Sequence, residues 1–164
     1  MSGKVSRAAY LTLFAAAMGW LEAVVVIYLR DVAGLSHRGP LPGAGEIMSR
    51  LHSIPWLLPT EQTREAATMV MLATVAWLAG DGPRSRFGAF IAIFGIWDIA
   101  YYVGLWALIG WPTSLGAMDL LFLLPPHRWW YQPVGLPIVI SLVMIAVGFW
   151  LFLESHSGNR RRAS

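Results

Sequence analysis

Long apolar stretches are the feature of this sequence that most limits how the chain can fold. Crossing the ~30 Å hydrocarbon core of a bilayer takes about 20 mostly apolar residues in an α-helix. Four stretches reach or approach that length, and they cover residues 7–30, 61–80, 86–110 and 135–154. The sequence therefore predicts an all-α fold, a four-helix transmembrane bundle that forms one membrane domain over residues 1–164.

The composition also favours a membrane location. Hydrophobic residues make up 57% of the chain and charged residues only 13%, whereas soluble domains carry about 25% charged residues. So few charges leave too little polar surface to cover a water-soluble globule, and lipid is the apolar phase that such a surface would meet. The chain has no cysteine, which excludes disulfides, thiolate metal sites and cysteine nucleophiles.

Local signals suggest where the second and third helices begin. Thr60 is a suitable N-cap for the stretch 61–80, and Ser85 is a suitable N-cap for the stretch 86–110. The uncharged part of the second helix, residues 66–80, is short on its own. That helix reaches membrane length only when its acidic first turns are included.

Two long connections join these helices. Residues 31–59 are rich in glycine and proline, so we expect an outer loop, with a short helix near residues 46–51. Residues 111–133 contain an apolar run at 120–124 that is too short to span a bilayer. Residues 129–131 are aromatic, of the types favoured at the headgroup level. We therefore expect residues 111–133 to form a re-entrant or interfacial segment.

Basic residues predict how the chain is oriented in the membrane. In a four-span protein, Lys4, Arg7, Arg84, Arg86 and the basic tail at residues 155–164 share one side. They lie in short segments next to helix ends, where the positive-inside rule is strongest. Both termini are therefore expected in the cytoplasm. The tail is expected to contact anionic lipid and no nucleic acid, because the chain has no recognisable nucleic-acid-reading module.

Four acidic residues lie where burial in a membrane is costly. Glu22 and Asp98 are deep within predicted helices, whereas Glu65 and Asp119 lie near a membrane boundary. A carboxylate at the bilayer centre costs a few kcal/mol even on lenient insertion scales, and it usually marks a functional site or a buried pair. The four-span topology brings these acids toward the same side, so we expect them to line one cavity open to the non-cytoplasmic face.

Several nearby side chains offer support to these acids. Tyr101 and Tyr102 can donate hydrogen bonds to a carboxylate, and Arg64 can pair with one. His127 follows Asp119 closely in the sequence, whereas the other three histidines are expected to be solvated or interfacial. Ser141 lies on an otherwise apolar helix and is expected to bond to its own backbone.

Such a cluster of acids can serve three purposes. It can hold a divalent cation, because Mg²⁺, Ca²⁺ and Mn²⁺ prefer oxygen ligands. It can relay protons, because burial and mutual repulsion favour protonated carboxyl groups. It can also pair with Arg30, Arg64 or Arg128 as an internal ionic lock that fixes packing without doing chemistry.

A set of short motifs gives the chain a resemblance to a known group of proteins. The motifs are GWLEAVVV at 19–26, REAAT at 64–68, FGIWDIAYY at 94–102, GWPTSL at 110–115 and DLLFLLP at 119–125. Together they resemble a family of uncharacterised bacterial multi-pass integral membrane proteins. The resemblance implies a location in the bacterial inner membrane and implies no activity.

Two functions remain open from the sequence. The first is a membrane protein whose carboxylate cluster binds a cation or handles protons, as a transport component or as a metal-dependent membrane enzyme. The second is a structural or assembly subunit of a larger membrane complex, in contact with partner proteins or with further copies of itself. A fourth helix without charges, residues 135–153, suits the second function, because such a helix can face lipid or a partner equally well.

Overall fold

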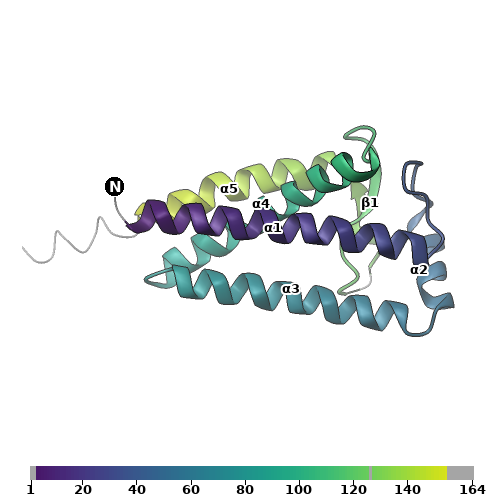
Figure 1. Cartoon of the computed structure of the whole chain (residues 1–164), viewed down its shortest axis with the longest axis horizontal. Helices are drawn as coiled ribbons and strands as arrows, with labels where there is room; N and C mark the ends of the chain where they lie inside the picture. Colours follow the sequence, from purple (N-terminus) through teal and green to yellow (C-terminus); the bar gives the residue numbers. More distant parts are fainter. Residues whose placement is uncertain (1–2, 126, 155–164) are drawn as a thin grey trace, which may run out of the picture.

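The computed structural model of the protein describes residues 3–125 and 127–154, so the predicted basic tail at residues 155–164 lies outside the described residues. Within the described part there are five α-helices and one two-stranded sheet. The helices are α1 (Gly3–Val32), α2 (Ala44–Ser53), α3 (Leu57–Ala79), α4 (Pro83–Ile109) and α5 (Gly135–Glu154). Figure 1 shows α1, α3, α4 and α5 running lengthwise, with α2 at the end far from the N-terminus.

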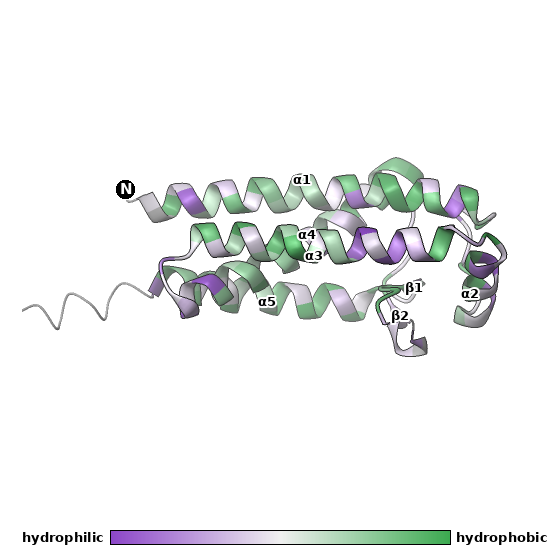
Figure 2. Cartoon of the chain, turned by 90° about the horizontal axis from the view of Figure 1, so that it is seen from below, coloured by the Kyte–Doolittle hydropathy of each residue, from purple (hydrophilic) through white to green (hydrophobic). Residues whose placement is uncertain are grey.

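Three of the long helices have the properties of membrane spans. Residues Val5–Val32, Pro83–Ile109 and Gly135–Glu154 are long and apolar enough to cross a bilayer. They correspond to the predicted helices 7–30, 86–110 and 135–154, so the expectation of long helices with the length and apolar composition of membrane spans is confirmed for these three. Figure 2 shows the same property as hydrophobic colour along α1 and α5.

Helix α4 lies at the centre of the bundle, where it contacts α1, α3 and α5. Glycines permit the closest approaches. A Cβ atom added to Gly148 of α5 would lie 2.6 Å from the backbone nitrogen of Ala92, and one added to Gly95 of α4 would lie 2.6 Å from the carbonyl oxygen of Ser141. Gly19 of α1 packs against the α4 backbone in the same way. Small residues at such contacts let helix backbones approach closely.

Both predicted N-caps are wrong. Helix α3 begins at Leu57, and Thr60 lies inside its first turn, where its hydroxyl donates to the carbonyl oxygen of Trp56. Helix α4 begins at Pro83 after an extended Gly82, so Ser85 is a buried residue within the helix. Proline is well suited to the first helical turn because it has no N–H to leave unpaired, and this signal decides the start of α4.

Helix α3 differs from the other three long helices in its polarity. Among the described helices it is not one of those apolar enough to span a membrane by composition. Figure 2 shows a hydrophilic stretch in the half of α3 that lies nearer to α2. The buried residues of that half include Glu61, Glu65 and Thr68, so the polar side chains face the interior of the protein.

The two connections contain more regular structure than the sequence indicates. The predicted outer loop 31–59 contains helix α2, which covers the expected short helix at 46–51. The segment 111–133 contains strands β1 (Met118–Leu120) and β2 (Tyr131–Pro133), which pair antiparallel with Asp119 opposite Gln132. A 3₁₀ turn at Arg128–Trp130 precedes β2.

The chain between the two strands lies against the helices. Phe122 packs against the rings of Phe94 and Trp97 of α4, with ring centroids 6.2 Å apart in both pairs. The side-chain amide of Gln62 in α3 donates to the carbonyl oxygen of Leu123 over 3.0 Å. Residues 118–123 therefore fill space between α3 and α4.

We expect the variant Gly148→Ala to be less stable than the wild-type protein. Its Cβ would meet the Ala92 backbone at 2.6 Å and the carbonyl oxygen of Gly88 at 2.7 Å, and overpacking of this kind costs about 1–3 kcal/mol. Thermal unfolding in detergent, followed by tryptophan fluorescence, measures the change.

The matched control is Gly45→Ala in α2, where nothing lies within 4 Å of an added Cβ. This variant should be unchanged or more stable by up to about 1 kcal/mol, because alanine favours a helix over glycine. Equal melting temperatures for Gly148→Ala and the wild-type protein would contradict the close packing of α4 and α5.

Candidate functional site

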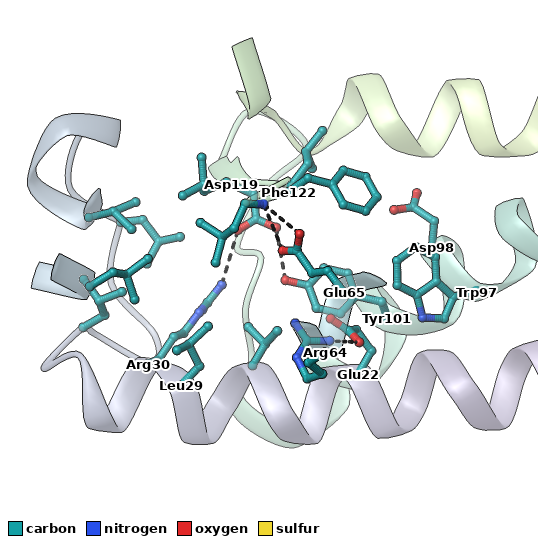
Figure 3. A pocket seen from close by; sticks show the side chains of 18 residues that line it. Glu22, Leu29, Arg30, Arg64, Glu65, Trp97, Asp98, Tyr101, Asp119 and Phe122 are labelled. Carbon is teal, nitrogen blue, oxygen red and sulfur yellow. Dashed lines mark hydrogen bonds and ion pairs between the residues drawn. The ribbon is translucent and has the colours of Figure 1, made fainter. Parts of the chain in front are cut away.

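All four acids singled out from the sequence line one cavity at the α2 end of the bundle. Glu22 comes from α1, Glu65 from α3, Asp98 from α4 and Asp119 from β1. The cavity has a volume of about 80 Å³. Figure 3 shows these carboxylates around it, together with the side chains of Arg30, Arg64 and Tyr101. Further lining residues are apolar, among them Leu35, Leu41, Ile47 and Leu51 from the 33–43 connection and α2.

Arg64 joins two of the helices through ion pairs. Its Nη1 donates to Oε2 of Glu22 over 2.5 Å, and its Nε donates to Oε2 of Glu61 over 2.7 Å. The first bond links α3 to α1, and the second spans three residues within α3. The supporting role expected of Arg64 therefore includes Glu61, a residue that the sequence interpretation overlooked although the i, i+3 spacing on one helix face was visible.

Asp119 has a different set of partners. Its Oδ1 lies 3.7 Å from Nη2 of Arg30, and its Oδ2 accepts bonds from the hydroxyls of Tyr101 and Tyr102 over 3.2 and 3.3 Å. Burial raises the pKa of the Asp119 carboxyl, and the Arg30 charge and the two tyrosine hydroxyls oppose that effect. The Arg30 guanidinium also lies over the Trp111 ring, 3.9 Å from its centroid. This is a cation–π contact at a desolvated site.

Glu65 and Asp98 are held by neutral donors. The backbone N–H of Leu123 donates to both oxygens of Glu65 over 2.9 and 3.0 Å. The Ser141 hydroxyl donates to Oδ2 of Asp98 over 2.8 Å, so the expectation that Ser141 bonds to its own backbone is wrong. Among the side chains that the structure describes, which do not include those of Lys4 and Arg128, no arginine, lysine or histidine nitrogen lies within 4.0 Å of either carboxylate.

His127 does not take part in this cavity. It is exposed, its ring packs edge-on against Trp129, and its Nδ1 accepts the Trp129 backbone N–H over 3.2 Å. It lines a separate surface depression with Trp130 and Gln132. Proximity to Asp119 in the sequence was misleading because β1 and the turn before β2 carry the two side chains to different places.

The cavity carries more negative than positive groups. Its lining includes four carboxylates and two guanidinium groups. Both guanidinium groups are already in ion pairs, Arg64 with two glutamates and Arg30 with Asp119. Across residues 3–125 and 127–154, however, no group of three histidine, cysteine, aspartate or glutamate side chains is placed to hold a metal ion. The excess charge is therefore spread around the cavity and does not converge on one point.

We expect Arg64→Gln to destabilise the protein by about 2–4 kcal/mol. Removing one partner of a buried ion pair typically costs ~3–5 kcal/mol, and we discount this because the Arg64 side chain is 23% exposed. Adding Glu22→Gln to Arg64→Gln should restore part of the loss, since one of the uncompensated charges is then removed. Unfolding midpoints in a denaturing detergent titration measure these differences.

The control for this prediction is Arg84→Gln. Arg84 pairs with Glu154 at 3.5 Å, but both side chains are more than half exposed, so the loss should stay below about 1 kcal/mol. Equal losses for Arg64→Gln and Arg84→Gln would show that the Arg64 pairs do not hold α1 and α3 together.

No protein-family model, no curated protein and no solved structure matches this chain. The resemblance to bacterial multi-pass membrane proteins therefore stays a prediction. What the cavity does has to follow from its own residues and from the charges that they carry.

Proposed function

We propose that the chain crosses the bilayer four times, with α3 as the fourth span and both termini in the cytoplasm. Helix α3 has 23 residues, which is about 35 Å at 1.5 Å per residue and enough for the ~30 Å core. Its acidic turns point into the protein, while Val70, Trp77 and Leu78 are exposed. Intramembrane charges that face the interior of a bundle are typical of spanning helices. The family resemblance adds the bacterial inner membrane as the location.

A chain without cysteine offers a direct test of this topology. We expect a membrane-impermeant maleimide to label Gly43→Cys on intact bacterial cells, and to label Gly82→Cys only after the cells are permeabilised. An added Cβ meets nothing within 4 Å at either position, so neither variant disturbs packing. If both cysteines react on intact cells, α3 lies outside the membrane and the four-span proposal fails.

We propose further that the cavity takes up and releases protons at Glu65 and Asp98. The observation that carries this proposal is that neither carboxylate has an ion pair within 4.0 Å among the side chains that the structure describes, while both nearby arginines form ion pairs with other acids. An ionised carboxylate in a desolvated site without a partner is strongly disfavoured, and binding a proton removes that cost. Neutral donors from Leu123 and Ser141 leave each group one or more free acceptor positions for a proton.

The other acids of the cavity suit a structural role. Glu22 and Glu61 share the single positive charge of Arg64 in ion pairs, and Asp119 is paired with Arg30. Ion pairs of this kind fix packing without requiring proton exchange. We therefore divide the predicted site into ionic locks, at Glu22 and Asp119, and proton-binding groups, at Glu65 and Asp98. A divalent cation is less well supported than a proton because the described carboxylates do not converge on one point.

A second candidate function is supported by the surface of α5. Exposed apolar residues follow this helix almost from end to end, and they are Leu136, Val139, Ile140, Leu142, Val143, Val147, Trp150 and Leu153. Such a face fits lipid, a partner membrane protein or a second copy of this chain. In that case the chain is an assembly subunit, and gentle detergent extraction followed by native mass spectrometry would find it bound to another chain.

The proton proposal predicts an infrared signature in the purified protein. We expect a protonated-carboxyl band that decreases as the pH is raised, and we expect Glu65→Gln and Asp98→Asn each to remove part of it. Both substitutions keep the side-chain shape, and thermal unfolding checks that the variants remain folded. The control is Glu46→Gln, because Glu46 lies on α2 with a side chain that is 54% exposed and paired with Arg50.

Two results would count against the proposal. One is a pH-dependent band that is identical in the wild-type protein and in the Glu65→Gln and Asp98→Asn variants. The other is a band that disappears at constant pH when Mg²⁺ is added, because that result identifies a cation site instead.

A further inference from the structure

Arg30 stands out among the cavity residues because its donors are unused. The residue is 2% exposed, yet neither Nη1 nor Nη2 has a hydrogen-bond partner in the described structure. Its distance of 3.7 Å to Asp119 is an ion pair without a hydrogen bond. Figure 3 shows the guanidinium pointing from α1 into the cavity. Buried guanidinium donors are normally satisfied, and leaving them unpaired is costly.

The unused donors of Arg30 fit an oxygen-bearing group. A guanidinium presents a planar fork of N–H donors that matches a carboxylate better than any other common group. Asp119 does not take this role in the structure, because its Oδ2 is engaged by the hydroxyls of Tyr101 and Tyr102. Arg30 therefore keeps donors available for a carboxylate that enters the cavity.

The opposite side of the cavity has the complementary property. In Figure 3, Asp98 lies on the side away from Arg30, and Glu65 lies between them. Neither carboxylate has an ion pair within 4.0 Å among the side chains that the structure describes, and the Arg64 charge acts on Glu65 only from beyond that distance. A positively charged group placed there gains two favourable interactions, which are stronger in a desolvated site than in water.

The balance of charge decides between the classes of ligand. A simple anion on Arg30 would add to an excess of carboxylates, and a simple cation would leave the Arg30 donors unpaired. A molecule that carries both groups satisfies both sides and adds no net charge. The geometry points to a small zwitterion, with a carboxylate on Arg30 and an ammonium group beside Glu65 on the side toward Asp98, as the ligand of this cavity. This inference rests on the proposed function because it uses the same two proton-binding carboxylates.

The size of the cavity restricts the ligand further. A volume of about 80 Å³ is several times the ~10–15 Å³ that one water molecule requires. It is far below the ~300–1,000 Å³ of pockets for drug-sized molecules. The ligand is therefore an amino acid of the smallest kind, with about five or six non-hydrogen atoms. Displacement of protons from Glu65 and Asp98 by its ammonium group would couple binding to proton release.

The experiment compares three probes on the full chain purified in detergent. Glycine carries both groups, acetate carries only the carboxylate, and methylammonium carries only the cation. Isothermal titration calorimetry is expected to show saturable glycine binding, with at least tenfold weaker binding of acetate and of methylammonium. Repeating the glycine titration in buffers of different ionisation enthalpy should show protons released on binding.

Variants then test the proposed contacts. Arg30→Lys keeps the charge beside Asp119 but loses the fork, and Arg30→Gln with Asp119→Asn removes both charges together, so that neither variant leaves an unpaired buried charge. Each is expected to weaken glycine binding at least tenfold. Arg84→Gln, at the far end of α4 and more than half exposed, should bind glycine as the wild-type protein does.

Several outcomes would overturn the inference. Absence of glycine binding, acetate binding as tight as glycine binding, or unchanged affinity in the folded Arg30→Lys and double variants would each do so. These failures are distinguishable from failure of the proposed function. If the infrared band still responds to Glu65→Gln and Asp98→Asn, the cavity handles protons and only the zwitterion is excluded.

Discussion

Charge balance inside an apolar bundle is the constraint on which the α2 end of this protein depends. Ionised groups that leave water need partners of opposite charge and hydrogen bonds, or they must become neutral. Arg64 meets this need for Glu22 and Glu61, and in doing so it ties α3 to α1. Arg30 meets it for Asp119 and brings β1 against α1. The same pairs that solve the electrostatic problem therefore also position the cavity walls.

The two ways of joining helices in this fold explain why a cavity exists. Helix α4 meets α1 and α5 through glycines, so their backbones are in close contact over much of their length. In the half nearer to α2, helix α3 is instead joined by polar groups, which include Arg64, Gln62 and Glu65. Long polar side chains hold two helices further apart than glycines do, because glycines let the backbones touch. The half of α3 nearer to α2 therefore lies further from its neighbours. Residues 118–123 fill part of the space, and the remainder is the cavity.

The sequence was sufficient to predict the long helices and to single out the four acids of the cavity, and there is a physical reason for this. Runs of about 20 apolar residues leave few alternatives to a helix, and a carboxylate within such a run is conspicuous whatever its partner. Because the helices alternate in direction, Glu22, Glu65 and Asp98 could be placed near one another from topology alone. The structure places them with Asp119 around one cavity.

The details that the sequence did not reveal all depend on contacts between distant segments. Ser141 was expected to bond to its own helix backbone. Its hydroxyl instead donates to Asp98, which lies 43 residues earlier in the chain. The apolar run at 120–124 was expected in a re-entrant or interfacial segment, but its contact with α3, where the Leu123 N–H donates to Glu65, was not visible in the sequence. Thr60 resembled an N-cap, but helix α3 continues past it toward Leu57. In each case a tertiary contact or an alternative helix start outweighed a plausible local signal.

The distribution of donors supports the proposal that the cavity is more than the by-product of two ionic locks. A lock that evolved only for packing would be expected to hydrogen-bond its arginine directly to the acids that it pairs with, as Arg64 does with two glutamates. Arg30 is more deeply buried than Arg64 and yet leaves both terminal nitrogens without hydrogen bonds in the described structure. Glu65 and Asp98 likewise have no ion pair within 4.0 Å among the side chains that the structure describes. Unused donors and uncompensated acceptors around one space are what a site needs before its ligand arrives, and pure packing gives no reason for both to occur together.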